Sequence, residues 1–160
     1  MDLAVIETGN GGDLQLVGND LALVYAGENN PYLGMFGGNI EAVTKTKVQE
    51  ELSYDWWGNT LLMPNNQSIQ FNSLTERILN STPLTSSGRI QIENTIKKDL
   101  AFMGDFADIF VSVSIVATDR IQVTIRITLS DSSVKVKVIN FRKKLDGDFF
   151  ISDFNDDFFI

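Results

Sequence analysis

The sequence contains no cysteine and no histidine among its 160 residues. Protein zinc sites are built mainly from these two residue types, so a zinc centre of that kind is excluded. The same absence excludes disulfide bonds and the serine–histidine and cysteine–histidine pairs of nucleophilic catalysis. An enzyme built on this chain would have to use carboxylates, lysine, tyrosine or a bound metal.

Basic residues are scarce: 13 Lys and Arg stand against 21 Asp and Glu, which gives a net charge of −8. Affinity for nucleic acids comes largely from clustered Lys and Arg. The only basic run is Arg142-Lys143-Lys144, which is too short to form such a cluster. We therefore expect no nucleic-acid partner.

Long hydrophobic runs are also missing, since no stretch approaches the roughly 18–20 apolar residues that span a bilayer. The opening segment, "MDLAVIETGNGG", lacks the basic start and the long apolar core of a signal peptide. We therefore expect no membrane partner and a soluble chain that is made in the cytoplasm.

Apolar residues make up 43% of the chain, which is enough for one domain with a hydrophobic core. Segments 108–117, 121–129 and 134–141 alternate apolar and polar residues, as antiparallel strands with one buried face do. The middle segment, "IQVTIRITL", alternates strictly. These segments predict an antiparallel sheet of at least three strands with one dry face.

The third of these segments carries valines and lysines in turn. Its pattern predicts that the three valines lie on one face and the two lysines on the opposite, solvated face; they are Val134, Val136 and Val138 against Lys135 and Lys137. The two lysines could also pair with the acidic C-terminal segment.

A long helix is predicted ahead of the sheet. Ser86 or Ser87 can cap its start, and the helix is expected to run to about Met103. Glu93 and Lys97 are spaced to pair on its polar side. One apolar stripe repeats along it at Ile92, Ile96, Leu100 and Met103. This stripe is the natural cover for the dry face of the sheet, so the fold class is predicted to be α+β.

Shorter elements precede the long helix. Ser73 and Glu76 have the spacing of a capping box, which predicts a short helix over about 73–80. At the N-terminus, strand patterns at 2–6, 14–17 and 21–25 alternate with Asn-Gly and Gly-Gly turn signals and predict a β-meander over about 1–26. We expect a single α+β domain over 1–144, followed by a C-terminal tail over 145–160.

Acidic residues are the candidates for catalysis or metal binding. Glu93 and Asp99 share the long helix, but a separation of six residues rotates them by about 240° from one another, so they do not face one site. Asp146 with Asp148, or Asp156 with Asp157, could hold a cation, although the other ligands of a calcium loop are missing. The sequence assembles no nucleophile, base and oxyanion donor. We therefore assign no catalytic residue, no metal site and no cofactor.

The C-terminal tail combines five Asp and five Phe with no basic residue. Phenylalanines are costly to leave in water, at about 25 cal/mol per Å² of apolar surface. The tail therefore either folds back as an edge strand or binds another chain through aromatic anchors. The candidate partner-binding residues of the tail are Phe149, Phe150, Phe154, Phe158 and Phe159.

The two tryptophans of the chain are adjacent, in the segment "SYDWWGN". An extended backbone would direct Trp56 and Trp57 to opposite faces. One ring would then pack in the core, and the other would cover a loop or meet a partner; core packing alone is the alternative. Asp55 and Asn59 are expected to hold the turn by side-chain to backbone hydrogen bonds.

The order of these features resembles a known family. The chain runs from "GDLQLVGNDLALV" through "YDWWGN", a short helix and a long helix to "FVSVSIVATDRIQVTIRITL". This order is similar to that of the small baseplate protein of Mu-like contractile-tailed phages, and to the T-even baseplate wedge protein that initiates the tail sheath. The resemblance covers roughly residues 10–130, and Trp56-Trp57-Gly58 is its most specific element.

The resemblance implies a structural protein of a contractile tail or related injection system, without enzymatic activity. Its partners would be other wedge proteins, hub or tube proteins and the sheath, in a sixfold hetero-oligomeric assembly. It would be located in the virion tail baseplate and assembled in the host cytoplasm. Joining by added strands would suit such a role, because backbone hydrogen bonds supply affinity and alternate side chains supply register.

The chain departs from the family pattern in one place. The T-even branch looks to carry a Glu-Pro-Arg motif where the long helix ends, and this chain has "DLAFMGD" at 99–105. Any role of that motif is therefore not carried over. That family has also been labelled lysozyme-like, but the sequence places no pair of carboxylates across a glycosidic bond. The alternatives are a generic α+β protein-binding module and, less favoured, a peptidoglycan glycosidase.

Overall fold

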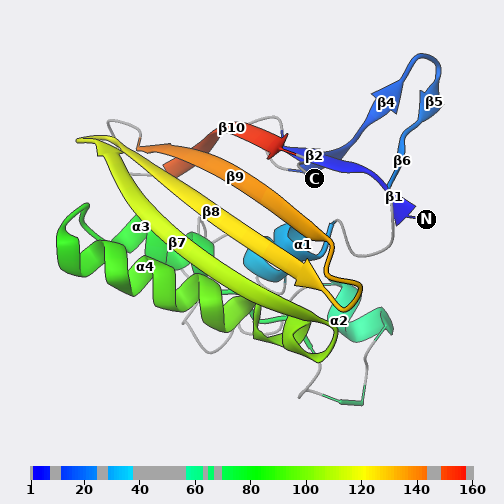
Figure 1. Cartoon of the computed structure of the whole chain (residues 1–160), viewed down its shortest axis with the longest axis horizontal. Helices are drawn as coiled ribbons and strands as arrows, with labels where there is room; N and C mark the ends of the chain where they lie inside the picture. Colours follow the sequence, from blue (N-terminus) through cyan, green and yellow to red (C-terminus); the bar gives the residue numbers. More distant parts are fainter. Residues whose placement is uncertain are drawn as a thin grey trace.

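The computed structural model describes residues 2–7, 12–24, 29–37, 57–62, 65–66, 70–143 and 149–157. Its centre is one antiparallel sheet with helices against a single face (Figure 1), so the predicted α+β fold class is confirmed. The strands lie in the order β10-β9-β8-β7. Their bounds are Ala107–Ala117 for β7, Arg120–Leu129 for β8, Val134–Lys143 for β9 and Phe149–Asp157 for β10.

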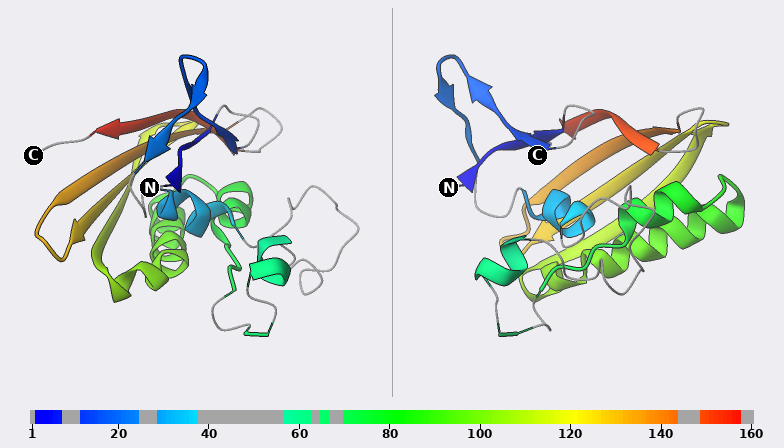
Figure 2. Two further views of the ribbon diagram at one scale, coloured as in Figure 1. Left: turned by 90° about the vertical axis from the view of Figure 1, so that its right-hand side faces the viewer. Right: turned by 180° about the vertical axis from the view of Figure 1, so that it is seen from behind.

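The helical layer lies below the sheet in the two further views (Figure 2). The longest helix, α4, packs on β7 and is preceded by α3. Two shorter helices complete the layer. The bounds are Asn30–Phe36 for α1, Trp57–Leu62 for α2, Thr75–Ser81 for α3 and Ser86–Asp99 for α4, followed by the 3₁₀ turn η2 at Ala101–Asp105.

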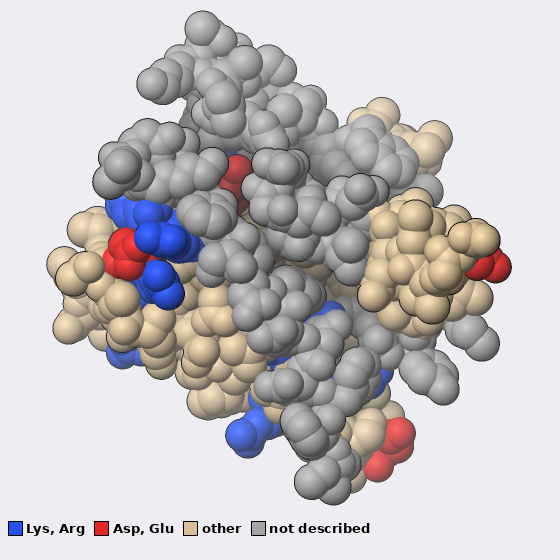
Figure 3. All heavy atoms as spheres, turned by 90° about the horizontal axis from the view of Figure 1, so that it is seen from above, with Lys and Arg blue, Asp and Glu red and all other residues tan. Residues whose placement is uncertain are grey.

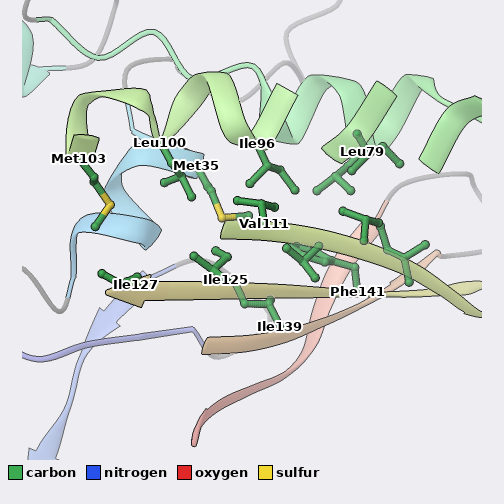
Figure 4. Packing of buried hydrophobic residues seen from close by; sticks show 14 of the residues in the cluster. Met35, Leu79, Ile96, Leu100, Met103, Val111, Ile125, Ile127, Ile139 and Phe141 are labelled. Atoms are coloured by element: carbon green, nitrogen blue, oxygen red, sulfur yellow. The ribbon is translucent and has the colours of Figure 1, made fainter. Parts of the chain in front are cut away.

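The core lies between α4 and the sheet. Ile121, Val123 and Ile125 of β8 have no exposed surface, as the strict alternation of that strand predicts. Ile96, Leu100 and Met103 of the predicted stripe point toward the sheet strand that carries Ile125 (Figure 4). All four residues of the stripe are buried: Ile92, Ile96, Leu100 and Met103. The helix itself ends at Asp99, so Met103 reaches the core from η2 rather than from a helix that continues to it.

The predicted helix caps are wrong in detail. Ser73 does not cap α3, because its hydroxyl donates to the Gly34 carbonyl. The N-cap residue of α3 is Leu74, whose side chain makes no capping hydrogen bond. The carboxylate of Asp99, at the end of α4, caps the helix instead. The cap of α4 is Thr85, whose Oγ1 accepts a hydrogen bond of 3.1 Å from Gly88 N. Local spacing could not reveal a cap that comes from a distant helix.

The predicted orientation of β9 is also wrong. Register places Lys137 opposite Ile125 and Lys135 opposite Ile127, and both isoleucines belong to the buried row of β8. Residues directly opposite in an antiparallel pair lie on the same face. The two lysines therefore lie on the helix-covered face, and the three valines of β9 lie on the open face. Alternation separates the two faces of a strand, but it does not say which one is covered.

The C-terminal segment joins the sheet. β10 pairs antiparallel with β9, from Phe149 opposite Lys143 to Asp157 opposite Val136. The register shifts between Ile151 and Asp153. Of the two arrangements that the sequence left open, the structure has the edge strand. Residues 144–148 and 158–160 lie outside the described part of the chain.

The N-terminal strands are present, but they do not pair as a simple meander. Three short ladders form instead: β1 with β6, β2 with β3, and β4 with β5. The first strand of the region therefore pairs with its last. The bounds are Asp2–Leu3 for β1, Val5–Glu7 for β2, Gly12–Leu14 for β3, Leu16–Val17 for β4, Asp20–Leu21 for β5 and Leu23–Val24 for β6.

Candidate functional site

The most distinctive surface is a hairpin that projects from the body beyond β10 (Figure 1). We call residues 14–24 the β-arm. Large apolar side chains along it are exposed: Leu16 is 66%, Val17 65% and Leu23 60% exposed, followed by Leu14 at 43% and Leu21 at 41%. Contiguous exposed apolar surface on a soluble protein marks an interaction site more often than not.

The tip of the β-arm is a two-residue turn. Val17 pairs with Asp20, so Gly18 and Asn19 are the central residues. Gly18 has a φ of 65°, a conformation that glycine adopts without steric cost. Asp20 Oδ1 accepts a hydrogen bond of 2.8 Å from Leu21 N and braces the turn. The sequence "VGND" therefore holds the two strands of the arm in register.

The base of the β-arm is a branched junction around Ala4. Ala4 N donates to the Ala22 carbonyl, the Ala4 carbonyl accepts from Gln15 N, and Ala22 N donates to the Gln15 carbonyl. Ala4 is only 2% exposed. These three bonds tie together the residues that join β1 to β2, β3 to β4 and β5 to β6, so the direction of the arm is set by backbone hydrogen bonds.

Asn29 attaches this junction to the helical layer. Its Oδ1 accepts from Val5 N at 3.2 Å, and its Nδ2 donates to the Leu3 carbonyl at 2.6 Å. The side chain is 7% exposed and stands at the start of α1. This buried amide holds the N-terminal strands against the start of α1, because losing it would leave two backbone groups without hydrogen-bond partners, which is costly.

The arm belongs to a part of the chain that carries charge of one sign. Residues 1–44 contain six Asp and Glu, of which Asp20 lies in the arm, and no Lys or Arg. A two-stranded hairpin by itself is marginal in water, so the arm gains stability from any partner that covers its leucines. Apolar exposure and negative charge together fit a partner with an apolar groove and a basic rim.

The open face of the sheet offers a second, more polar surface. Phe110 lies on it, opposite Arg126, and is 56% exposed; Val116, at the register shift of β7, is 53% exposed. Near the β7–β8 turn, Arg142 Nε lies 2.9 Å from Asp119 Oδ2 and Arg120 Nε lies 3.7 Å from Asp119 Oδ1. Figure 3 looks onto this side of the molecule and shows basic side chains gathered around an acidic one.

The free edge of β7 is guarded by α4. Arg89 Nη1 donates to the Val113 carbonyl at 3.0 Å, and Glu93 Oε2 accepts from Val113 N at 3.2 Å. Together they supply the donor and the acceptor that a neighbouring strand would offer to Val113. The two side chains also form an ion pair with each other at 3.1 Å. Such covering of edge groups protects a sheet from unwanted pairing.

The predicted partner-binding residues are only partly described. Trp57 is the first residue of α2, but its side chain lies outside the described residues, as does all of Trp56. Phe149, Phe150 and Phe154 lie in β10, where only the backbone is described. Phe158 and Phe159 lie outside the described residues. The structure therefore does not bring the two groups together or separate them.

The neighbourhood of Trp57 is better defined at Asn59. The side chain of Asn59 donates to the Phe71 carbonyl at 2.7 Å and accepts from Phe71 N at 2.9 Å. It is 1% exposed. Asn59 was predicted to hold its own turn, but these two bonds join it to the backbone of Phe71, 12 residues away. Asp55 lies outside the described residues.

The two acids of α4 have separate structural partners. Asp99 Oδ2 accepts hydrogen bonds from Leu74 N, Thr75 N and Thr75 Oγ1 at 2.8, 2.8 and 2.7 Å. Burial nevertheless raises the pKa of Asp99, because desolvation of the carboxylate outweighs those bonds. The hydrogen bond from Lys97 is the main reason that the pKa of Glu93 is lowered. As predicted, these acids do not face one site.

A cleft of about 410 Å³ lies between the end of α4, η2 and the start of β7. Its charged lining residues are Lys97 and Asp108, and Lys97 already contacts Glu93 at 2.7 Å. A glycosidase site needs two carboxyl groups about 5–10 Å apart. This cleft supplies one.

Metal binding finds no support in the described part of the chain, where no three Asp or Glu side chains gather in a way that could hold an ion. Asp156 and Asp157 lie in β10, and Asp146 and Asp148 lie outside the described residues. Among the helices whose residues are described, none is long and apolar enough to cross a membrane.

Comparison with known proteins adds no relative. No family model, no curated protein and no solved structure matches the chain.

The β-arm was not among the predicted contact residues. The sequence pattern predicts strands for its leucines but does not indicate what they contact. The signal that could have identified them is the coincidence of regularly spaced leucines with a complete lack of Lys and Arg over residues 1–44. A strand that belongs to the edge of a stable sheet often carries lysine on its exposed positions, and this arm does not.

Proposed function

We propose that this protein is a non-enzymatic assembly component of a contractile-tail baseplate, and that the β-arm is its principal docking element. The observation that carries the proposal is the projecting hairpin with Leu16, Val17 and Leu23 at least 60% exposed. Fully burying one such side chain contributes about 1.5–3 kcal/mol. A few of these side chains in one partner groove are enough to anchor a stable contact.

The use of acids elsewhere in the molecule supports a role without catalysis. Asp99 is occupied as a helix cap and Glu93 as part of the β7 edge guard. Both act within the fold. The cleft beside η2 has one acid, and the reaction classes that need a cysteine or histidine are excluded by composition.

The class of assembly rests on the family resemblance of the chain. In that setting the partners would be wedge, hub or tube and sheath proteins, and the site would be the virion tail baseplate. The phenylalanines of the C-terminal segment and the tryptophan pair remain proposed secondary contacts. A generic α+β protein-binding module is the second candidate, because an exposed apolar arm would serve it equally well.

The test is capture of named partners by the purified full chain. Wild type, a Leu16→Ser/Val17→Ser variant and a matched control are each presented to separately expressed wedge, tube and sheath subunits encoded beside the gene. The control is Phe110→Ser/Val116→Ser, which removes two apolar side chains of comparable exposure, 56% and 53%, from β7.

We expect wild type and the control to bind at least one of these subunits, and the arm variant to bind it at least tenfold more weakly. Equal binding by all three proteins would show that the arm is not the docking element. Binding to none of the tail subunits would overturn the baseplate assignment and favour the generic binding module.

A further inference from the structure

A lysine lies among the core residues of the sheet. Lys137 of β9 is 8% exposed and stands opposite Ile125, which is fully buried. The same row of β9 continues with Ile139 and Phe141, both almost completely buried. Lysine is among the residues least often buried, so its presence on the covered face of an interior strand needs a physical reason.

One physical reason is that β9 is at times the edge strand of the sheet. An inward-pointing charge, most often a lysine, is a common device by which an edge strand avoids pairing with unsuitable strands. In the order β10-β9-β8-β7, β9 is an edge whenever β10 is absent. Lys135 lies on the same face two residues earlier, and β10 ends opposite Val136, before it reaches Lys135.

β10 matches this edge along the helix-covered row of β9. Ile151 is the register partner of Phe141, and Phe154 is the register partner of Ile139. Opposite Lys137 the register places Asp156. Apolar residues thus oppose apolar residues, and an acid opposes the lysine, which are the pairings that stabilise neighbouring strands. Besides β9, β10 contacts α3 and β2, and one connection, residues 144–148, joins it to β9.

We propose that β10 is an exchangeable strand, and that the edge of β9 accepts β10 from a second copy of this chain in place of its own. Exchange of an identical element preserves every contact of the closed form and changes only the path of the connection, so it is a low-cost route to a dimer. The Lys137–Asp156 position selects this strand over others, because an unmatched strand would leave the lysine without an opposing acid.

The test uses two charge-reversed full-length variants. In Lys137→Glu, the new Glu faces Asp156 of the same chain. In Asp156→Lys, the new Lys faces Lys137 of the same chain. In a one-to-one mixture, each β10 finds a matched β9 only in the other variant. We expect each variant alone to remain a monomer and the mixture, after refolding together, to give a heterodimer with twice the mass of 17.8 kDa by native mass spectrometry.

Two controls separate exchange from other causes. The Lys137→Glu/Asp156→Lys double variant restores the match within one chain and should be a folded monomer by circular dichroism. Mixing Lys135→Glu with Asp156→Lys should give no heterodimer, because position 135 has no register partner in β10. If either single variant is unfolded alone, recovery of its circular dichroism in the mixture still reports the exchange.

A mixture that stays monomeric or unfolded while the double variant folds would overturn the proposal. The experiment contains only this chain, so its outcome is independent of whether the β-arm binds a baseplate subunit. Exchange could fail while partner capture succeeds, and the reverse is equally open.

Discussion

The core and the β-arm are built from the same apolar residue types and use them in opposite ways. Leu100 at the end of α4 has no exposed surface, whereas Leu16 in the arm is 66% exposed. In the core, a helix stripe and a strand row meet face to face, and each covers the other. The arm has two strands and no covering layer. The apolar content of a segment therefore determines how much surface is favourable to bury. The topology of the fold decides whether another part of the same chain buries it.

The two regions should differ most in how much the free energy of unfolding falls when a leucine is replaced by alanine. Leu100→Ala should lower the free energy of unfolding by about 3 kcal/mol, because it removes buried surface and leaves a cavity. Leu16→Ala should change it by less than about 0.5 kcal/mol. Urea denaturation followed by circular dichroism measures both. Similar losses for the two variants would mean that the arm packs against the body in solution.

The second prediction concerns the cap that connects α4 with α3. Asp99→Ala should lower the free energy of unfolding by about 2–3 kcal/mol, since it removes the cap and leaves the partly buried donors of Leu74 and Thr75 without their acceptor. Asp99→Asn keeps an acceptor oxygen and should cost less. Thermal and urea unfolding of both variants check this order; equal losses would show that the negative charge, rather than the acceptor, is what matters.

A smaller effect is expected at the guarded edge of β7. Arg89→Ala removes the bond to the Val113 carbonyl and should cost about 1 kcal/mol. Lys98→Ala, on the exposed side of the same helix, is the matched control and should be close to neutral. The Arg89 variant should also show faster amide exchange along β7 than wild type. Unchanged exchange there would argue that the guanidinium does not protect the edge.

The smallest effects are those of pH, and they should have opposite signs at the two acids of α4. The pKa of Asp99 is raised above 3.8, so its folded state binds the proton more tightly and stability falls as the pH rises from below 3.8 through the folded-state pKa. The pKa of Glu93 is lowered below 4.5, so the stability that it contributes is present above 4.5 and is lost as the pH falls through the folded-state pKa.

Comparing wild type with Asp99→Asn and Glu93→Gln isolates these two contributions. Relative to wild type, the Asp99 variant should gain stability as the pH rises from about 3 to 6, and the Glu93 variant should lose it. Urea midpoints measured across that range provide the test. Parallel pH profiles for the two variants would contradict the assigned environments.

Local periodicity determined much of the fold from the sequence alone. The strict alternation of "IQVTIRITL" identified β8 and its buried row, and the spacing of Ile92, Ile96 and Leu100 identified the helix face that covers it. Both inferences work because side-chain direction follows from backbone geometry over a few residues. The absence of Cys and His likewise removed whole reaction classes without any structure.

Tertiary structure alone decided which surfaces meet. The covered face of β9 holds Lys137 because register with β8 places it there, although the valine row is the more apolar one. Asp99 caps α3 across 25 positions, and the strands of the arm pair in a branched order that leaves Leu16 and Leu23 outside. These contacts join residues far apart in the chain, and their energies depend on packing and desolvation that no local pattern encodes.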